Sequence, residues 1–400
     1  MTMGFSKNYN QFREPARKIK LYQLLLIIFF TVQLLLFAIN DLPDIVFTSL
    51  GFRSATNTTD RDQIANNFTG ILGIDLQRDE KLPVLSDNGR TALLIAGIDS
   101  REVYIKNGEF INPLENGTRH IDSIMQIVFD HKTNELFQIS IPRDTGVDIR
   151  MDCLKFSGNI HWLYTKGQRS TCEGKGIEVL KNGVETITGI KSQYFVIVSL
   201  EAFPKIIEAV AVKNDKGEKG IYLDNPNTFS EIYPADNQTG WENVYFPKGN
   251  IFLTPRRALQ FARSRQFTSD FSRAARQQLV VQAVIKHGLA MGLLSEPSKI
   301  QELITVFSDY ILMSPPEDLN ELLGMIKVAQ LVDVDNMHHI VLDPDFGNEG
   351  YEKYLNKPPH DRRGAYYLVP TAWKECPGNE FCKVQEKIEY YFKNPEEIND

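Results

Sequence analysis

Thr91-Ala-Leu-Leu-Ile-Ala-Gly97 is a continuous apolar run that ends in a glycine. Such a run is typical of a strand buried at the centre of a sheet. Two further apolar runs cover residues 123–129 and 135–141, and the polar sequence Asp130-His-Lys-Thr-Asn134 between them predicts the turn of a β-hairpin. These three runs predict the core of a β-sheet.

Helical patterns and further short strands alternate along the rest of the chain. A helix that begins at Thr254 is expected because threonine is a good N-cap and Pro255 fits the first turn. A helix that ends at Gly189 is expected because glycine tolerates the left-handed conformation that terminates helices. The other predicted helices cover residues 200–210, 273–291, 297–312 and 317–331, and the other predicted strands cover residues 194–198, 339–342 and 365–369.

Residues 212–250 are rich in Asn, Gly and Pro and predict a long loop that folds over a site. Strands mixed with helices throughout the chain predict an α/β layered domain.

The N-terminus combines basic residues with a long apolar segment over residues 19–39. A span of about 20 apolar residues is long enough to cross a bilayer. Basic residues such as Arg17 and Lys18 precede the segment, and Asp41 and Asp44 follow it, which predicts a cytoplasmic N-terminus and an extracytoplasmic C-terminal domain. The segment lacks a small-residue cleavage site, so a retained single-pass anchor is favoured over a cleaved signal peptide.

The net charge of −7 argues against non-specific nucleic-acid binding, which needs a broad basic face. All four cysteines follow the apolar segment, and an even number in an exported domain predicts disulfides. Proximity favours Cys153–Cys172 and Cys376–Cys382. The alternatives are free thiols or a metal site, but neither pair has the CxxC spacing of a zinc site.

Arg-plus-Asp groups flank the three core strands. Asp99 and Arg101 follow the first strand, and ligands of open α/β sheets bind beyond such strand ends. Arg119 and Asp122 precede the second strand, and Arg143-Asp144 follows the third. Carboxylates are ligands for Mg²⁺, and arginines bind phosphate oxygens in a bidentate manner. The alternative is a set of internal salt bridges that fix turns.

A second basic cluster contains Arg263, Arg265, Asp270, Arg273 and Arg276 among apolar residues. We expect an extended backbone at Arg263 and Arg265, which puts both side chains on one face. Arg273 and Arg276 are expected on one face of the first turn of a helix, whose N-terminal end favours an anion. The four arginines together predict a pyrophosphate site.

The order of these motifs resembles the LytR–CpsA–Psr phosphotransferases of bacterial envelopes. The matching segments are Leu93-Leu-Ile-Ala-Gly-Ile-Asp-Ser-Arg101, Arg119-His-Ile-Asp-Ser123, Ser140-Ile-Pro-Arg-Asp-Thr145, Lys155 with Asn159, and Ala258-Leu-Gln-Phe-Ala-Arg-Ser-Arg265 with Asp270–Gln278. The Lys155–Asn159 spacing is two residues longer than the family's usual motif.

The resemblance implies an α/β/α layered domain with a mixed central sheet and an apolar pocket for a lipid tail. It implies an enzyme that transfers a glycopolymer, with its phosphate, from a polyprenyl-pyrophosphate carrier to peptidoglycan or another envelope acceptor. Mg²⁺ would be bound by Asp99 and Asp122. The pyrophosphate would contact Arg101, Arg119, Arg143, Arg263, Arg265, Arg273, Arg276 and Gln277.

Of these residues, Arg143, Arg273 and Arg276 would act in catalysis together with Asp270, which would orient the arginines or serve as the base. Two alternatives stay open: a lipid-pyrophosphate hydrolase that uses the same residues, and a non-catalytic protein that binds the lipid carrier or acts as a scaffold. The expected organisation is a basic tail over residues 1–18, an anchor over 19–39, a linker over 40–89, a catalytic domain over 90–290 and a C-terminal extension of helices and short strands over 291–400.

Overall fold

The computed structural model describes residues 89–98, 104–106, 109–111, 120–169, 171–172, 174–200, 202–234, 240–264, 270–290, 311–314, 328, 331–346, 354–356, 368–371 and 376–399. All of them belong to one compact unit of the chain. Within these ranges, no helix has the length and apolar character needed to cross a bilayer. The anchor predicted over residues 19–39 lies outside them.

A six-stranded sheet with strand order β14-β8-β1-β4-β5-β15 forms the centre of this unit. The three predicted core strands are β1 (Arg90–Ile98), β4 (Ile121–Asp130) and β5 (Glu135–Ile141). They pair antiparallel, and the predicted hairpin joins β4 to β5. β8 (Tyr194–Ser199) runs parallel to β1, so the sheet is mixed, as the resemblance implied.

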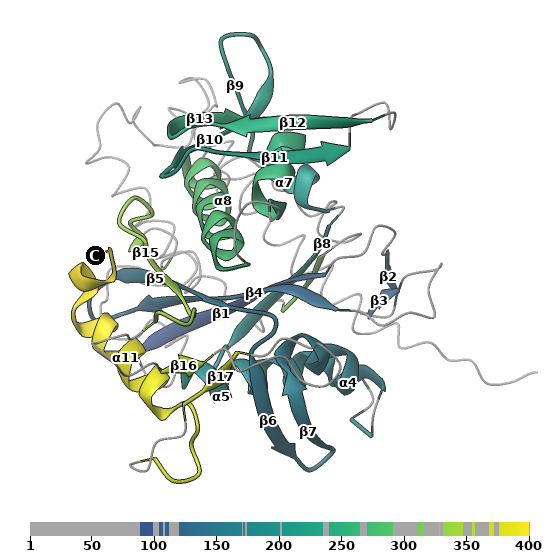
Figure 1. Ribbon diagram of the computed structural model, residues 1–400, viewed down its shortest axis with the longest axis vertical. Coiled ribbons are helices and arrows are strands. Elements are labelled where there is room, and N and C mark those ends of the chain that lie inside the picture. Colours follow the sequence, from purple (N-terminus) through teal and green to yellow (C-terminus); the bar gives the residue numbers. More distant parts are fainter. Residues whose placement is uncertain are drawn as a thin grey trace, which may run out of the picture. The chain divides into compact units, whose positions relative to one another are not determined.

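The sheet is buried on both faces, which explains its continuous apolar runs. Ala92, Leu94 and Ala96 of β1 face a core that also contains α5 (Gly176–Thr188) and α11 (Cys382–Lys393). The alternate residues Leu93 and Ile95 pack in another cluster with side chains of α8 (Asp270–Ala290). Helices therefore cover both faces, and the layered α/β/α arrangement is visible in Figure 1.

Local signals in the sequence set the helix ends. α5 ends at Gly189, which adopts the left-handed conformation with φ 74°. α7 (Pro255–Arg263) begins after Thr254, whose side chain accepts a hydrogen bond from the backbone N–H of Arg257 at 3.4 Å. α6 (Ala202–Ala209) lies within the predicted helix over residues 200–210.

The prediction of a long loop over residues 212–250 was wrong. The segment forms β9 (Val212–Lys213), β10 (Lys219–Asn225), β11 (Phe229–Pro234), β12 (Trp241–Phe246) and β13 (Gly249–Leu253). Gly217 and Pro247 fall in the turns, while Leu223, Val244 and Phe246 point into a second core and alternate with residues that face away.

The C-terminal part of the chain joins the same sheet rather than forming a separate extension. β14 (Ile311–Met313) pairs with β8, although its residues lie at or next to the end of a segment predicted as helix. β15 (His338–Val341) pairs in parallel with β5, as part of the strand predicted at residues 339–342. The boundary expected near residue 290 is therefore not a boundary of the sheet.

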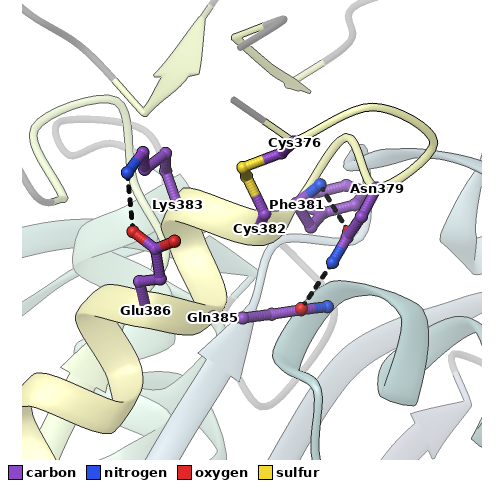
Figure 2. The surroundings of a disulfide bond; sticks show 7 residues. All are labelled: Cys376, Asn379, Phe381, Cys382, Lys383, Gln385 and Glu386. Carbon is purple, nitrogen blue, oxygen red and sulfur yellow. Dashed lines mark hydrogen bonds and ion pairs between the residues drawn. A yellow bond between two sulfur atoms is a disulfide. The ribbon is translucent and has the colours of Figure 1, made fainter. Parts of the chain in front are cut away.

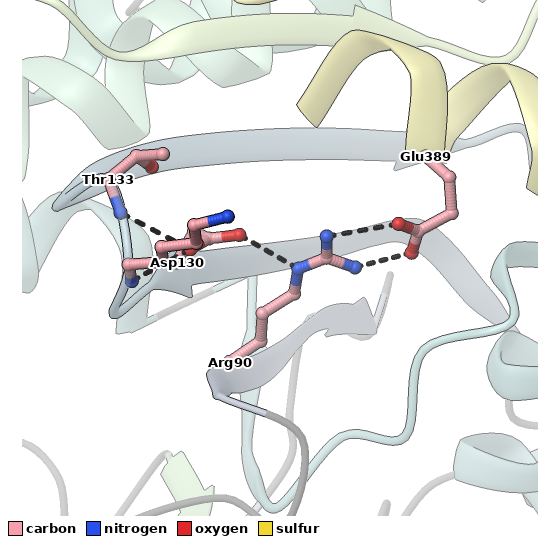
Figure 3. Close-up of polar contacts among 5 residues, drawn as sticks. Arg90, Asp130, Thr133 and Glu389 are labelled. Carbon is pink, nitrogen blue, oxygen red and sulfur yellow. Dashed lines mark hydrogen bonds and ion pairs between the residues drawn. The ribbon is translucent and has the colours of Figure 1, made fainter. Parts of the chain in front are cut away.

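Arg90 links the C-terminal helix to two strands of the sheet (Figure 3). Its Nε donates to Asp130 of β4 at 3.0 Å, and its Nη2 donates to Glu389 of α11 at 3.0 Å. The guanidinium carbon also lies 4.3 Å from the ring centroid of Phe392. These contacts fix α11 against the start of β1.

Both predicted disulfides are formed. Cys153–Cys172 joins the turn between β6 (Gly146–Met151) and β7 (Leu154–Asn159) to the segment after α4 (Leu163–Arg169). Cys376–Cys382 closes the loop at the start of α11, where Asn379 donates to Gln385 Oε1 at 2.8 Å (Figure 2). Gln385 Nε2 in turn donates to the Thr186 carbonyl of α5 at 2.9 Å.

Candidate active site

A pocket of about 430 Å³ lies between one face of the sheet and the helices α6, α7 and α8. Most of its lining is aliphatic and comes from β1, β4, β8 and the buried faces of the helices. Such a lining excludes charged ligands from the body of the pocket but accepts a hydrocarbon chain. The lipid-tail pocket that the resemblance implied has a counterpart here.

The pocket has an apolar end and a polar end. Leu93, Ile127 and Ile285 line it where β1 begins and α8 approaches its C-terminus. Towards the end of β1 and the start of β4 and α8, the lining includes Asp122 and Arg273. A ligand with a long apolar tail and an anionic head fits this polarity.

A β-bulge brings Asp122 to the pocket. Gly97 pairs with Ser123 and Ile98 pairs with Ile121, so Asp122 is the extra residue on β4. In a regular strand Asp122 and Ser123 would face opposite sides of the sheet, yet both line the pocket. The bulge therefore turns a carboxylate of the strand towards the polar end.

A network of polar side chains behind Asp122 holds Arg143. The Arg143 guanidinium forms an ion pair with Asp122, and its Nε lies 3.8 Å from Asp144. Asp144 accepts a hydrogen bond from Asn159 at 3.3 Å, and His161 Nδ1 donates to the Arg143 carbonyl oxygen at 2.9 Å. Asp144 and Asn159 therefore orient Arg143 from the side away from the pocket.

Arg273 and Arg276 have different surroundings although they are one turn apart in α8. Arg273 lines the pocket, and its Nη2 lies 3.4 Å from the Asp122 carbonyl oxygen. Arg276 donates to the carbonyl oxygens of Phe261 and Ser264 near the end of α7 and lies 4.7 Å from the Phe229 ring centroid. Burial lowers the pKa of Arg276 to about 10, so it stays charged at neutral pH.

Arg263 also reaches the pocket lining, but not from an extended segment. It is the last residue of α7, so the extended backbone predicted at this position was wrong. The helix continues to Arg263 because Phe261 and Ala262 of its last turn are packed in the core.

Gln277 connects the elements around the polar end. Ser123 Oγ lies 2.8 Å from Gln277 Oε1, and Gln277 Nε2 is 3.4 Å from the Ala262 carbonyl oxygen. This side chain therefore joins β4, α7 and α8 at the pocket.

Four of the predicted site residues lie outside the described residues: Asp99, Arg101, Arg119 and Arg265. Asp270 is the first residue of α8, but the position of its side chain is not described. Among the described side chains, Asp122, Arg263, Arg273 and Gln277 line the pocket, and Arg143 contacts it through Asp122. The carboxylate of Asp122 suits a hard cation.

The family model for the LytR_cpsA_psr family matches residues 51–357 of the chain. The chain belongs to the LytR_cpsA_psr family. The matched range extends on both sides of the catalytic domain expected over residues 90–290.

A curated relative from Bacillus mycoides (strain KBAB4), the polyisoprenyl-teichoic acid–peptidoglycan teichoic acid transferase TagU, is 31% identical over 176 residues. The match covers 44% of this chain and 49% of the relative, so the chain spans about half the length of the curated relative.

Two solved structures share the fold. The crystal structure of Bacillus subtilis TagV has a TM-score of 0.50 and 21% identity, and the alignment covers 77% of this chain and 99% of that one. The structure of protein gbs0355 from Streptococcus agalactiae has a TM-score of 0.53 and 16% identity, with 77% and 89% coverage.

In this LytR_cpsA_psr protein, analysis of the sequence missed an aromatic and histidine cluster beside Asp122. The ring centroids of His120 and His161 are 5.2 Å apart, and those of His120 and Trp162 are 4.3 Å apart. Burial, followed by the nearby His161, lowers the pKa of His120. His120 was visible within the Arg119–Asp122 motif, but nothing in the sequence linked it to His161 and Trp162, which lie 41 and 42 positions away.

Proposed function

We propose that this protein is a membrane-anchored phosphotransferase that moves a glycopolymer from a polyprenyl-pyrophosphate carrier to peptidoglycan, outside the cytoplasmic membrane. The observation that carries the proposal is the polarity of the pocket: an aliphatic body that ends at Asp122, Arg263 and Arg273. An isoprenoid chain would lie in the body, and the pyrophosphate would lie at the charged end. The TagU relative supports this assignment, because its name describes a transfer from a polyisoprenyl-linked teichoic acid to peptidoglycan.

In the proposed reaction an acceptor hydroxyl attacks the phosphorus that carries the glycan. A new P–O bond to the acceptor forms, the bond to the bridging oxygen of the pyrophosphate breaks, and the lipid phosphate leaves with the electron pair. Phosphoryl transfer depends mainly on positioning and on charge stabilisation. Arg263 and Arg273 would bind non-bridging oxygens, and Arg143 would hold Asp122 in place.

Mg²⁺, held by Asp99 and Asp122, would offset the negative charge that develops on the leaving phosphate. Asp270, at the start of α8, would accept the proton of the acceptor hydroxyl or orient the arginines. These roles follow from the family resemblance and from the position of each residue in the chain.

The test is a transfer assay with a synthetic lipid-pyrophosphate disaccharide and soluble peptidoglycan fragments, with and without Mg²⁺. We expect the wild-type protein to release lipid phosphate and to attach the sugar phosphate to the fragments. Asp122→Ala and Asp99→Ala should each abolish both products, whereas Arg150→Ala, on the exposed face of β6, should leave them unchanged.

If the assay releases free sugar phosphate and attaches none to the peptidoglycan fragments, the protein is the lipid-pyrophosphate hydrolase of the first alternative and not a transferase. Stoichiometric lipid binding without any turnover in Mg²⁺ would instead support the non-catalytic carrier-binding alternative.

A further inference from the structure

The hairpin of β11 and β12 has one buried face and one face that exposes aromatic rings. Val244 and Phe246 of β12 are buried, and Phe246 stacks on Phe229 of β11 with ring centroids 4.9 Å apart. The alternate residues of β12 face the other side, where Trp241 is 70% exposed and Tyr245 is 55% exposed. The exposed rings are thus not part of the core of this unit, and large apolar groups exposed in this way mark interaction sites.

The described residues of the exposed face are uncharged. Asn243 lies between Trp241 and Tyr245 on the same side of β12, and on β11 Ser230 pairs with Tyr245 and Ile232 pairs with Asn243. None of these five residues carries a charge. At about 3.4 Å per residue, the backbone positions of Trp241 and Tyr245 are roughly 14 Å apart along the strand.

The hairpin is fixed to the helix that carries Arg263. Tyr233, which pairs with Glu242 in the hairpin, donates from its hydroxyl to the Gln260 carbonyl oxygen at 2.5 Å. Glu242 accepts hydrogen bonds from Arg256 at 2.6 Å and from Gln260 at 3.0 Å. Figure 1 shows β11 and β12 above α7, and the contacts of Tyr233 and Glu242 place α7 against the buried face of the hairpin, opposite to the exposed rings.

An uncharged face with aromatic rings and an amide between them matches a neutral polysaccharide. Rings pack against the apolar faces of sugars, and the amide and hydroxyl groups can exchange hydrogen bonds with sugar hydroxyls. An anionic lipid surface would instead be recognised by lysine and arginine, and the five described residues of this face include neither.

We propose that the exposed face of the β11–β12 hairpin binds the glycan strand of the acceptor. The inference rests on the proposed function, because the acceptor of the proposed reaction is the polysaccharide that such a surface would bind. Trp241 and Tyr245 would be the main contacts, and Asn243 would bind a polar group between them.

The experiment measures binding of the full-length protein, in mild detergent, to purified peptidoglycan sacculi and to an N-acetylglucosamine hexamer. The double variant Trp241→Ala/Tyr245→Ala should bind both probes about tenfold more weakly, which is what the loss of well-packed aromatic contacts costs. Tyr390→Ala removes a tyrosine that is 40% exposed on α11 and is the matched control, expected to bind as the wild type. Equal binding by the double variant and the wild type would overturn the proposal.

A second measurement separates a glycan from the membrane as the occupant. The chain has three tryptophans, so Trp162→Phe/Trp373→Phe leaves Trp241 as the sole tryptophan, whose emission can be excited selectively over that of the tyrosines. The hexamer should shift the emission of Trp241 in protein reconstituted into nanodiscs. Quenching by brominated lipid in the same discs, without a response to the hexamer, would assign the face to the bilayer and contradict the inference.

The inference and the proposed function can fail separately. With the lipid-pyrophosphate donor alone, the double variant should release lipid phosphate as slowly as the wild type, while the KM for peptidoglycan fragments should rise about tenfold. A different result is possible: the wild type binds sacculi but turns over no donor, and the double variant does not bind sacculi. This result would support the glycan surface and overturn the transferase assignment.

Discussion

Arg273 and Arg276 illustrate how neighbouring arginines of one motif take on different tasks. Arg273 lies at the polar end of the pocket, whereas Arg276 binds carbonyl oxygens of α7. A lysine keeps the charge of arginine but loses the planar set of donors. The effect of the same substitution should therefore differ between the two positions.

We expect Arg273→Lys to lower the rate of glycopolymer transfer about 100-fold, as for the loss of a donor that stabilises a transition state, with little change in melting temperature. Arg276→Lys should instead lower the free energy of unfolding by about 2 kcal/mol, because buried carbonyl oxygens lose donors. Transfer kinetics and denaturant unfolding of both variants measure the two effects. If Arg276→Lys lowered the transfer rate and Arg273→Lys lowered only the free energy of unfolding, Arg276 and not Arg273 would bind the pyrophosphate.

His339, on β15, predicts a pH dependence of stability. Burial, and to a smaller extent His338, lowers the pKa of His339 from 6.5 to about 4. Between these values the unfolded chain binds a proton that the folded protein excludes. The contribution of neutral His339 to the free energy of unfolding is therefore complete above about pH 6.5 and is lost as the pH falls towards 4.

The measurement is the urea midpoint of the wild type and of His339→Gln from pH 7.5 to pH 4.5. We expect the wild type to lose stability relative to the variant as the pH falls below 6.5. Parallel curves would mean that His339 titrates alike in both states, since the carboxylates that also protonate in this range are common to both proteins.

At the scale of the element, a disulfide holds the start of α11 in place. The Cys376–Cys382 disulfide closes the loop before the helix, and Gln385 on the first turn bonds α5 (Figure 2). A cross-link over a loop this short contributes about 2–3 kcal/mol in the chain-entropy model. α11 buries Val384, Ile388 and Phe392 in the core beneath the sheet, so loosening its start should affect the whole unit.

We expect Cys376→Ser/Cys382→Ser to lower the free energy of unfolding by about 2–3 kcal/mol. Cys153→Ser/Cys172→Ser, which opens a longer loop, should cost about 3 kcal/mol. Denaturant unfolding measures both, and peptide mapping of non-reduced wild-type protein should find the two pairs. Alkylation of all four cysteines in protein from its native envelope would contradict the prediction.

At the scale of the whole molecule, the basic N-terminus and the apolar residues 19–39 predict that the described unit lies outside the cell. Because the four native cysteines form disulfides, a new cysteine is a specific label. Lys393→Cys places a thiol at the exposed end of α11. A membrane-impermeant maleimide should label this variant in intact cells, and labelling only after lysis would reverse the predicted topology.

The sequence by itself determined the central strands, the helix boundaries at Gly189 and Thr254, and the pairing of both disulfides. Apolar runs such as Thr91–Gly97, the cap residues Thr254 and Gly189, and the spacing of the cysteines are local signals, and local sterics and hydrogen bonding are enough to interpret them. The motifs at the strand ends also indicated the polar end of the pocket, because strand ends meet at the edge of a sheet.

Only the tertiary structure decided which of the candidate residues meet. The bulge at Asp122, the helical conformation of Arg263 and the different contacts of Arg273 and Arg276 depend on pairing between strands and on packing between helices. The strands within residues 212–250 were hidden because each is short and its alternation is interrupted by turns. Contacts between residues far apart in the chain leave no local pattern in the sequence. The long-range geometry of the site, and of the exposed face of the β11–β12 hairpin, therefore comes from the fold.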